Sequence, residues 1–90
     1  MTTDDRLRQF IVNEMEWKGG AEVLTRDYHL IENGVVDSLG LFMLVSFIEN
    51  QFGILFELEE LNPHNFATIG AMTKLIEEKQ AANDEAVAQS

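Results

Sequence analysis

Residues 34–53 read GVVDSLGLFMLVSFIENQFG, and this stretch decides the fold. It begins as a loop, and from Ser38 to about Phe52 its apolar residues recur at helical spacing. Gly53 follows, a residue that can adopt the left-handed backbone conformation that ends a helix. At about 100° per residue, one arc of this helix collects a stripe of apolar residues that should face the core. The stripe consists of Leu41, Leu44, Val45, Ile48 and Phe52.

The same helix carries further large apolar residues on the side that should face water. The long loop before the helix could fold over some of them. Alternatively, they form an exposed apolar surface, and such surfaces mark sites where other proteins bind. The apolar residues on this side are Leu39, Phe42 and Met43, and the polar residues beside them are Ser46, Glu49 and Asn50.

Capping residues mark three more helices. Thr2 or Thr3 can cap the first of them, with Trp17 closing the element before two glycines. Asn62-Pro63 is typical of a cap followed by the first residue of a helix, here a single turn. Thr68 is expected to cap the last helix.

Residues 21–37 show no sustained period and are predicted to form a long loop, pinned to the core by some of its apolar side chains. The sequence therefore predicts an all-α protein. We expect a small four-helix bundle of three main helices plus one short helix, with the long loop between helices one and two. The domain is expected to cover residues 1–80, followed by a frayed or disordered tail over residues 81–90.

The composition excludes several classes of function. Sixteen acidic and six basic residues give a formal net charge of −10. Such a charge repels nucleic acids and anionic lipid surfaces, so neither is an expected partner, and it attracts surfaces rich in Arg and Lys. The absence of cysteine excludes thiolate zinc sites and cysteine nucleophiles. No apolar run approaches the ~20 residues of a membrane span, and the polar N-terminus does not resemble a secretory signal, so a cytoplasmic location is expected.

Ser38 lies where the loop ends and the apolar helix begins. A serine at a helix start can cap the helix by accepting a hydrogen bond from a free backbone N–H. Its hydroxyl can also carry a phosphate ester there, because the free N–H groups and the helix dipole favour an anion. The residues around Ser38 leave both possibilities open.

Catalytic and metal sites have little support in the sequence. A serine hydrolase is disfavoured because the chain lacks a Gly-x-Ser-x-Gly motif, and His29 and His64 are the only candidate bases. Neither histidine has the spacing of a metal ligand. His29 is expected at the surface of the loop, and His64 is expected either at the surface or in packing. Glu57, Glu59 and Glu60 lack the spacing of a calcium-binding loop and are expected to form a solvated face or a rim for a basic partner. We predict no catalytic residue and no metal site.

Beyond these local features, the chain resembles the acyl carrier protein family. The matching motifs follow the order and approximate spacing of that family and cover roughly residues 5–80. They are Asp27, Leu30, Gly34, Asp37-Ser38-Leu39, Glu49, Phe52-Gly53-Ile54 and Asn65-Phe66-Ala67-Thr68-Ile69.

The resemblance implies a cofactor and an attachment site. Ser38 would be esterified by 4′-phosphopantetheine, which a phosphopantetheinyl transferase takes from coenzyme A. The terminal thiol of this arm would hold acyl or aminoacyl groups as thioesters, and the protein itself would not be an enzyme. Asp37 would take part in recognition by the transferase. The residues implied in contacts with partner enzymes are Leu39, Phe42, Met43, Ser46 and Glu49.

The chain also departs from the carriers of fatty-acid synthesis, which usually have acidic residues after Ser-Leu and along the second helix. Here those positions hold Gly40, Met43, Asn50 and Gln51. The chain is more similar to free-standing carriers loaded by an adenylating acyl or aminoacyl ligase, or to carriers of polyketide and nonribosomal-peptide pathways. A downstream acyltransferase, synthase or modifying enzyme would then receive the cargo from a monomeric carrier. The alternative is a non-modified acidic helical adaptor that binds partners through the second helix alone.

Overall fold

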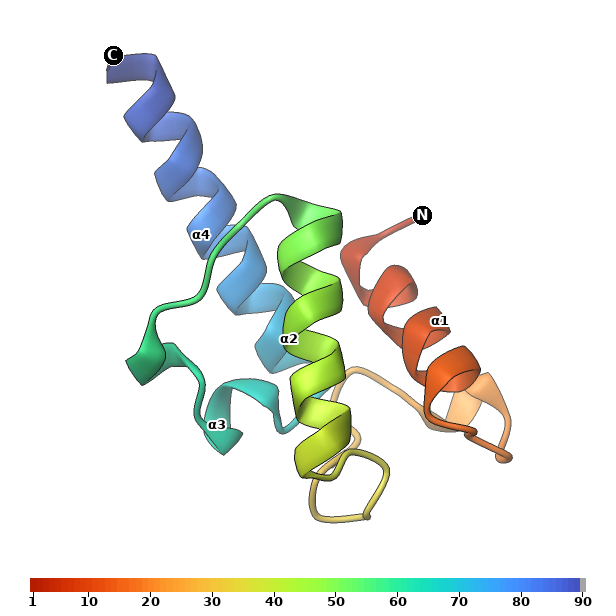
Figure 1. Cartoon of the computed structure of the whole chain (residues 1–90). Helices are drawn as coiled ribbons and strands as arrows, with labels where there is room; N and C mark the ends of the chain where they lie inside the picture. Colours follow the sequence, from red (N-terminus) through yellow and green to blue (C-terminus); the bar gives the residue numbers. More distant parts are fainter. Residues whose placement is uncertain (90) are drawn as a thin grey trace.

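A computed structural model describes the backbone of residues 1–89 and the side-chain surroundings of residues 1–83. It confirms the predicted all-α class, with three main helices, one short helix and a long loop between the first two main helices (Figure 1). Two 3-10 turns, η1 and η2, lie in the connections. In order, the elements are α1 (Thr3–Glu14), η1 (Ala21–Val23), α2 (Ser38–Phe52), η2 (Leu58–Glu60), α3 (Pro63–Phe66) and α4 (Ile69–Gln89).

Most helix ends follow the capping residues read from the sequence. Thr2, Asn62 and Thr68 each accept a hydrogen bond from the backbone N–H three residues later, at donor–acceptor distances of 3.1, 3.1 and 3.0 Å. Gly53 ends α2 with a φ of 66°, a conformation that glycine adopts without strain. Trp17 does not close α1, which ends at Glu14. Its indole Nε1–H instead donates a hydrogen bond to a loop carbonyl, at 3.0 Å.

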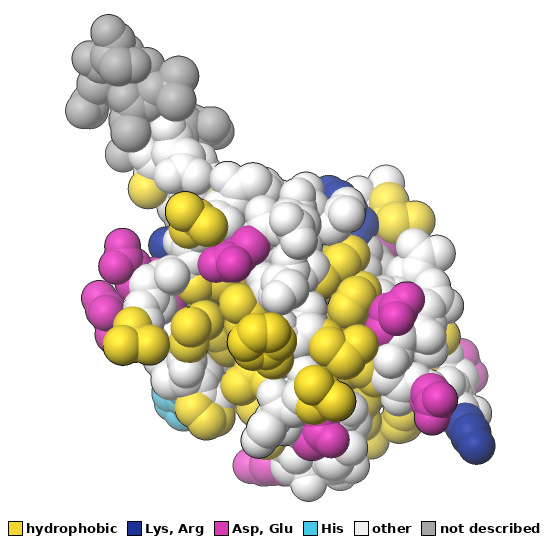
Figure 2. Space-filling model, viewed as in Figure 1, with side chains coloured by type: hydrophobic (Ala, Val, Ile, Leu, Met, Phe, Trp, Pro, Cys, Tyr) yellow, Lys and Arg dark blue, Asp and Glu magenta, His cyan; other side chains and the backbone are white. Residues whose placement is uncertain are grey.

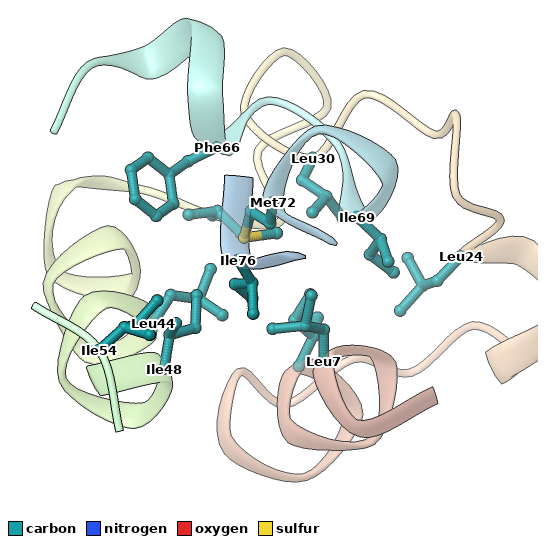
Figure 3. Close-up of a cluster of buried hydrophobic side chains, with 12 residues drawn as sticks. Leu7, Leu24, Leu30, Leu44, Ile48, Ile54, Phe66, Ile69, Met72 and Ile76 are labelled. Atoms are coloured by element: carbon teal, nitrogen blue, oxygen red, sulfur yellow. The ribbon is translucent and has the colours of Figure 1, made fainter. Parts of the chain in front are cut away.

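The core lies where α4 contacts α1, α2 and α3 (Figure 3). Leu44 and Ile48 of α2 are fully buried, which confirms the predicted orientation of this helix. The other stripe residues, Leu41, Val45 and Phe52, are half-buried and pack at the edge of the core. The buried apolar residues are Leu7, Ile11, Leu24, Leu30, Val36, Leu44, Ile48, Ile54, Phe66, Ile69, Met72 and Ile76.

The long loop is pinned to this core, as predicted. Leu24, Leu30 and Val36 are all buried and together anchor both halves of the loop. The backbone N–H of Leu30 also donates to the carbonyl of Ala67, just before α4, at 2.8 Å. Buried backbone groups need such partners, so this bond fixes the position of the loop below the start of α2 (Figure 1).

Residues 53–56 of the connection between α2 and α3 are few and lack a partner strand, so the sequence predicts that they fill the core. The structure agrees with this prediction only in part. Ile54 is buried and Phe56 packs edge-on against Phe66, at a ring-centroid distance of 5.4 Å, but Leu55 between them is 77% exposed. The segment is extended, so successive side chains point to opposite sides. Further along, the carboxylate of Glu60 in η2 forms an ion pair with the ammonium group of Lys79 in α4, at 2.8 Å. Glu60 is therefore not part of a free acidic rim.

The Glu60 ion pair predicts a pH dependence of stability. A hydrogen bond from Lys79, followed by one from the backbone N–H of Glu57, holds the pKa of Glu60 below its ordinary value of 4.5. A carboxyl with a lowered pKa stabilises the fold above its unfolded pKa, and this contribution is lost as the pH falls through the folded pKa. We expect wild type to be more stable than Glu60→Gln above about pH 5.5, and the difference to shrink as the pH falls below about 4.5.

Chemical denaturation of both proteins across this pH range measures the two unfolding free energies. Their difference is the informative quantity, because protonation of the other acidic residues affects both proteins alike. A difference that stays constant with pH would show that Glu60 does not contribute through its charge.

The last helix, α4, is helical through Gln89, beyond the point near Gln80 where its apolar periodicity ends. The boundary between a carrier domain over residues 1–80 and a tail over residues 81–90 remains a prediction, and the side chains of residues 84–90 lie outside the described residues. Within the part of the chain that the structure describes, no helix is long and apolar enough to cross a membrane.

Candidate functional site

The start of α2 is capped by Asp37 and not by Ser38. The Asp37 carboxylate accepts a hydrogen bond from the N–H of Gly40 at 2.8 Å, and its backbone has the extended conformation of a cap residue. Ser38 is the first residue inside the helix and is exposed. Since Asp37 performs the capping, the Ser38 hydroxyl is left at the surface, at the positive end of the α2 dipole.

The loop before Asp37 is held by its own hydrogen bonds. The backbone N–H groups of Val35 and Val36 both donate to the carbonyl of Leu30, at 2.9 and 3.1 Å. Gly34 allows this tight turn because its φ of 75° lies in the left-handed region. The turn is attached to the core through the buried side chains of Leu30 and Val36. The backbone that leads into Asp37 and Ser38 is therefore held in place.

Gly40 lets the segment after α1 pack closely against the start of α2. It is buried, and a Cβ atom built at this position would lie 3.3 Å from the Asp37 carboxylate and 3.4 Å from the Met15 methyl group. The first distance is tighter than ordinary van der Waals contact, and the second is at the lower limit of that range. Position 40, where carriers of fatty-acid synthesis usually have an acid, is therefore in the interior in this chain.

A surface pocket of about 350 Å³ lies beside Ser38. Three segments that are distant in sequence form it: the turn at the end of the long loop, the first residues of α2, and the first residue of α3. Most of its wall is apolar, which suits an aliphatic group better than an ion. It is lined by Ile31, Gly34, Val36, Asp37, Ser38, Leu41 and Pro63.

The residues expected to contact partners lie along α2, and the long loop does not cover the most apolar of them. Leu39 is 68% exposed and Phe42 is 71% exposed. Ser46, one turn further, is exposed as well. Met43 is half-buried and lines a second pocket of about 280 Å³, which Leu39 and Asp37 also line. An apolar surface therefore borders Ser38.

Glu49 has a structural contact that its position on the helix did not predict. It is half-buried, and its carboxylate accepts a hydrogen bond from the backbone N–H of Phe56 at 3.0 Å. This bond ties the chain after α2 to the last turns of the helix. The expected contact of Glu49 with partner enzymes stays a prediction.

Neither histidine lines the pocket beside Ser38. His29 and His64 are both exposed, and the His29 ring nitrogen lies 3.9 Å from the carboxylate of Glu32. Among the residues that the structure describes, no group of three or more His, Asp or Glu side chains could hold a metal ion.

Sequence reasoning missed two exposed leucines, Leu55 and Leu58, which are 77% and 84% exposed. The signal for Leu55 was present in residues 54–56, where Ile54 and Phe56 point to the core and Leu55 between them points outward, as in an extended chain. Two glutamates, Glu57 and Glu59, flank Leu58 in the sequence and are also exposed. A leucine between two acids indicates a surface position.

These features define a class of protein: a small helical bundle that presents a free serine hydroxyl, an acidic cap and an apolar surface at the start of its second helix. They are the features that the resemblance to acyl carrier proteins implies. No protein-family profile matches the chain.

The chain is 35% identical over 52 residues to the curated protein "Probable acyl carrier protein PigG" of Serratia sp. (strain ATCC 39006). The match covers 58% of this chain and spans 60% of the relative's length. This similarity supports the resemblance to the acyl carrier protein family.

Proposed function

We propose that this chain carries acyl or aminoacyl groups as thioesters on a 4′-phosphopantetheine arm attached to Ser38. The observation that carries this proposal is the exposed hydroxyl of Ser38 at the first residue of α2, with capping left to Asp37. The similarity to a protein named as an acyl carrier supports it. Acyl carrier proteins are not enzymes, so the chemistry on the cargo belongs to partner proteins.

The attachment step is a phosphoryl-type transfer from coenzyme A. The Ser38 oxygen forms a bond to the phosphorus that bears the pantetheine, and the bond from that phosphorus to the oxygen of the leaving 3′,5′-adenosine bisphosphate breaks. A base of the transferase accepts the Ser38 proton. The resulting phosphodiester carries a negative charge, which the positive end of the α2 dipole stabilises.

The surroundings of Ser38 suit a swinging arm. The pocket of about 350 Å³ beside it offers an apolar wall on which part of the arm or its cargo can rest. The fixed turn over residues 30–36 keeps the attachment point in place while the arm moves. A flexible tether on a rigid base raises the effective concentration of the cargo at the active site of each partner.

The partners that we propose are a phosphopantetheinyl transferase, an adenylating acyl or aminoacyl ligase, and a downstream acyltransferase, synthase or modifying enzyme. Leu39 and Phe42 supply apolar contact area beside Ser38. The lack of acids early in α2 favours a ligase-loaded carrier over one of fatty-acid synthesis. The genes next to the one that encodes this chain would indicate the cargo. Each class of loading enzyme that such a gene could encode transfers a different kind of acyl group.

The test of this function is covalent modification in solution. Incubation of the protein with coenzyme A and a broad-specificity phosphopantetheinyl transferase should add the mass of one phosphopantetheinyl group. Intact-protein mass spectrometry measures the shift, and fragmentation should locate it at Ser38. An unchanged mass with several active transferases would contradict the proposal.

We expect Phe42→Ala to impair thioester loading by the adenylating ligase and to leave stability nearly unchanged. Phe42 is 71% exposed, so the fold loses little when its ring is removed. At a binding surface the same ring would supply much of the contact energy. Loading kinetics and thermal unfolding of the same samples separate the two effects. Equal losses of loading and stability would show that the ring acts in the core.

A further inference from the structure

The segment between α2 and η2 exposes an apolar surface with acids at its sides. Leu58 is 84% exposed and Leu55 is 77% exposed. The exposed acids Glu57 and Glu59 flank Leu58. Apolar and acidic side chains lie next to one another on the side of the molecule where this segment runs (Figure 2). We call residues 55–59 the Leu58 edge.

The Leu58 edge is held in place by hydrogen bonds from both ends. At its start, the N–H of Phe56 donates to the carboxylate of Glu49 at 3.0 Å. After it, the side-chain amides of Asn62 and Asn65 donate to backbone carbonyls of η2, both at 2.9 Å. The Glu60–Lys79 ion pair joins η2 to α4. Because the segment is fixed before binding, a partner that contacts Leu58 does not have to order it.

The charge around the edge is negative. Lys79 is the cation that this segment contacts, and Glu60 already pairs with it at 2.8 Å. Among the residues that the structure describes, neither Glu57 nor Glu59 forms an ion pair, so both carboxylates can act on an approaching surface. Such a surface attracts partners in which Lys and Arg surround an apolar recess.

The edge is also continuous with the Ser38 site. Pro63, at the start of α3, lines the pocket beside Ser38. It follows η2 after only two residues, Leu61 and Asn62. The chain therefore passes from the end of the Leu58 edge to the pocket beside Ser38 within four residues.

We propose that the Leu58 edge is a contact site for the phosphopantetheinyl transferase, an inference that rests on the proposed function. The transferase must bind coenzyme A, whose diphosphate and ribose phosphate require Lys and Arg at the mouth of its active site. When that mouth faces Ser38, cationic side chains meet Glu57 and Glu59, and an apolar recess takes Leu58. A second copy of this chain does not fit, because its own net charge is −10.

The experiment compares phosphopantetheinylation kinetics of wild type, Leu58→Ser, Glu59→Lys and the conservative Leu58→Met, with coenzyme A and one defined transferase. Val23→Ser is the matched control, since Val23 is an exposed apolar residue in η1. We expect Leu58→Ser to lower kcat/KM about fivefold or more through KM, with kcat nearly unchanged because Ser38 is intact. Glu59→Lys should also lower kcat/KM, and the loss should become smaller as the salt concentration is raised. Leu58→Met and Val23→Ser should react like wild type.

The outcomes separate the two proposals. If wild type is not modified at all, the proposed function fails and this inference fails with it. If wild type is modified and Leu58→Ser stays within about twofold of it, only the Leu58 edge is refuted. An equal loss in Val23→Ser, or a wild-type dimer that Leu58→Ser dissociates in sedimentation experiments, would also overturn the inference.

Discussion

The Ser38→Ala variant is expected to remain folded and to accept no phosphopantetheine. Ser38 is exposed and does not cap α2, so its hydroxyl contributes little to the fold. Without the oxygen there is no nucleophile for the phosphorus of coenzyme A, and modification should fall from complete to undetectable. Intact-protein mass spectrometry after incubation with the transferase measures the loss.

Thr25→Ala is the matched control for this variant. Thr25 is another exposed hydroxyl residue, and it lies in the long loop. Its replacement should leave modification complete, and circular dichroism should give the same helical content for all three proteins. If Ser38→Ala still gained the mass, a different side chain would be the attachment site. If wild type gained no mass while still binding partners through α2, the chain would be an adaptor.

The second large effect is expected for Leu44→Ala. Leu44 is fully buried on the core face of α2. Truncation of a buried leucine to alanine costs about 2–5 kcal/mol of unfolding free energy, since apolar contacts are lost and a cavity remains. For a chain of this size, such a loss is a large part of the total stability.

Leu58→Ala is the matched control for Leu44→Ala, because it makes the same chemical change at a leucine that is 84% exposed. Its effect on the unfolding free energy should be within about 0.5 kcal/mol. Urea denaturation of the three proteins gives the comparison. Similar losses for the two leucines would contradict the burial pattern of α2 and of the connection that follows it.

The sequence was most informative where a structure depends on neighbouring residues. Thr2, Asn62 and Thr68 cap their helices as predicted, because each bond joins residues only three positions apart. The core orientation of α2 also followed from its periodicity, since Leu44 and Ile48 recur every four residues. These features need no knowledge of the remaining fold.

The cap of α2 could not be settled in the same way. Asp37 and Ser38 are adjacent, and both residue types are good caps. The cap is the residue that keeps an extended backbone just before the helix, and in this chain that residue is Asp37. Its backbone conformation depends on the preceding turn, which is hydrogen-bonded to Leu30 and lies outside the helix. Assignments at helix ends commonly differ by a residue or two, yet here one residue decides whether the serine hydroxyl is free.

Contacts between segments that are distant in the chain could not be predicted from the sequence either. Glu60 was assigned to an acidic rim because Lys79 is 19 residues away and belongs to another helix. Leu58 was missed because the predicted core plug at residues 53–56 implied that the connection points inward. The structure shows that only Ile54 is fully buried there, that Phe56 packs against Phe66, and that Leu55 and Leu58 turn their side chains to the surface.

The tight packing at Gly40 limits how this chain can be converted into another kind of carrier. An acid grafted there, to imitate carriers of fatty-acid synthesis, would place a second carboxylate next to that of Asp37 and push against Met15. The graft would disturb the helix end that presents Ser38 before any new enzyme could recognise it. To make such a protein serve other partner enzymes, the end of α1 and the start of α2 would therefore have to be exchanged together, and a change of single surface charges would not be enough.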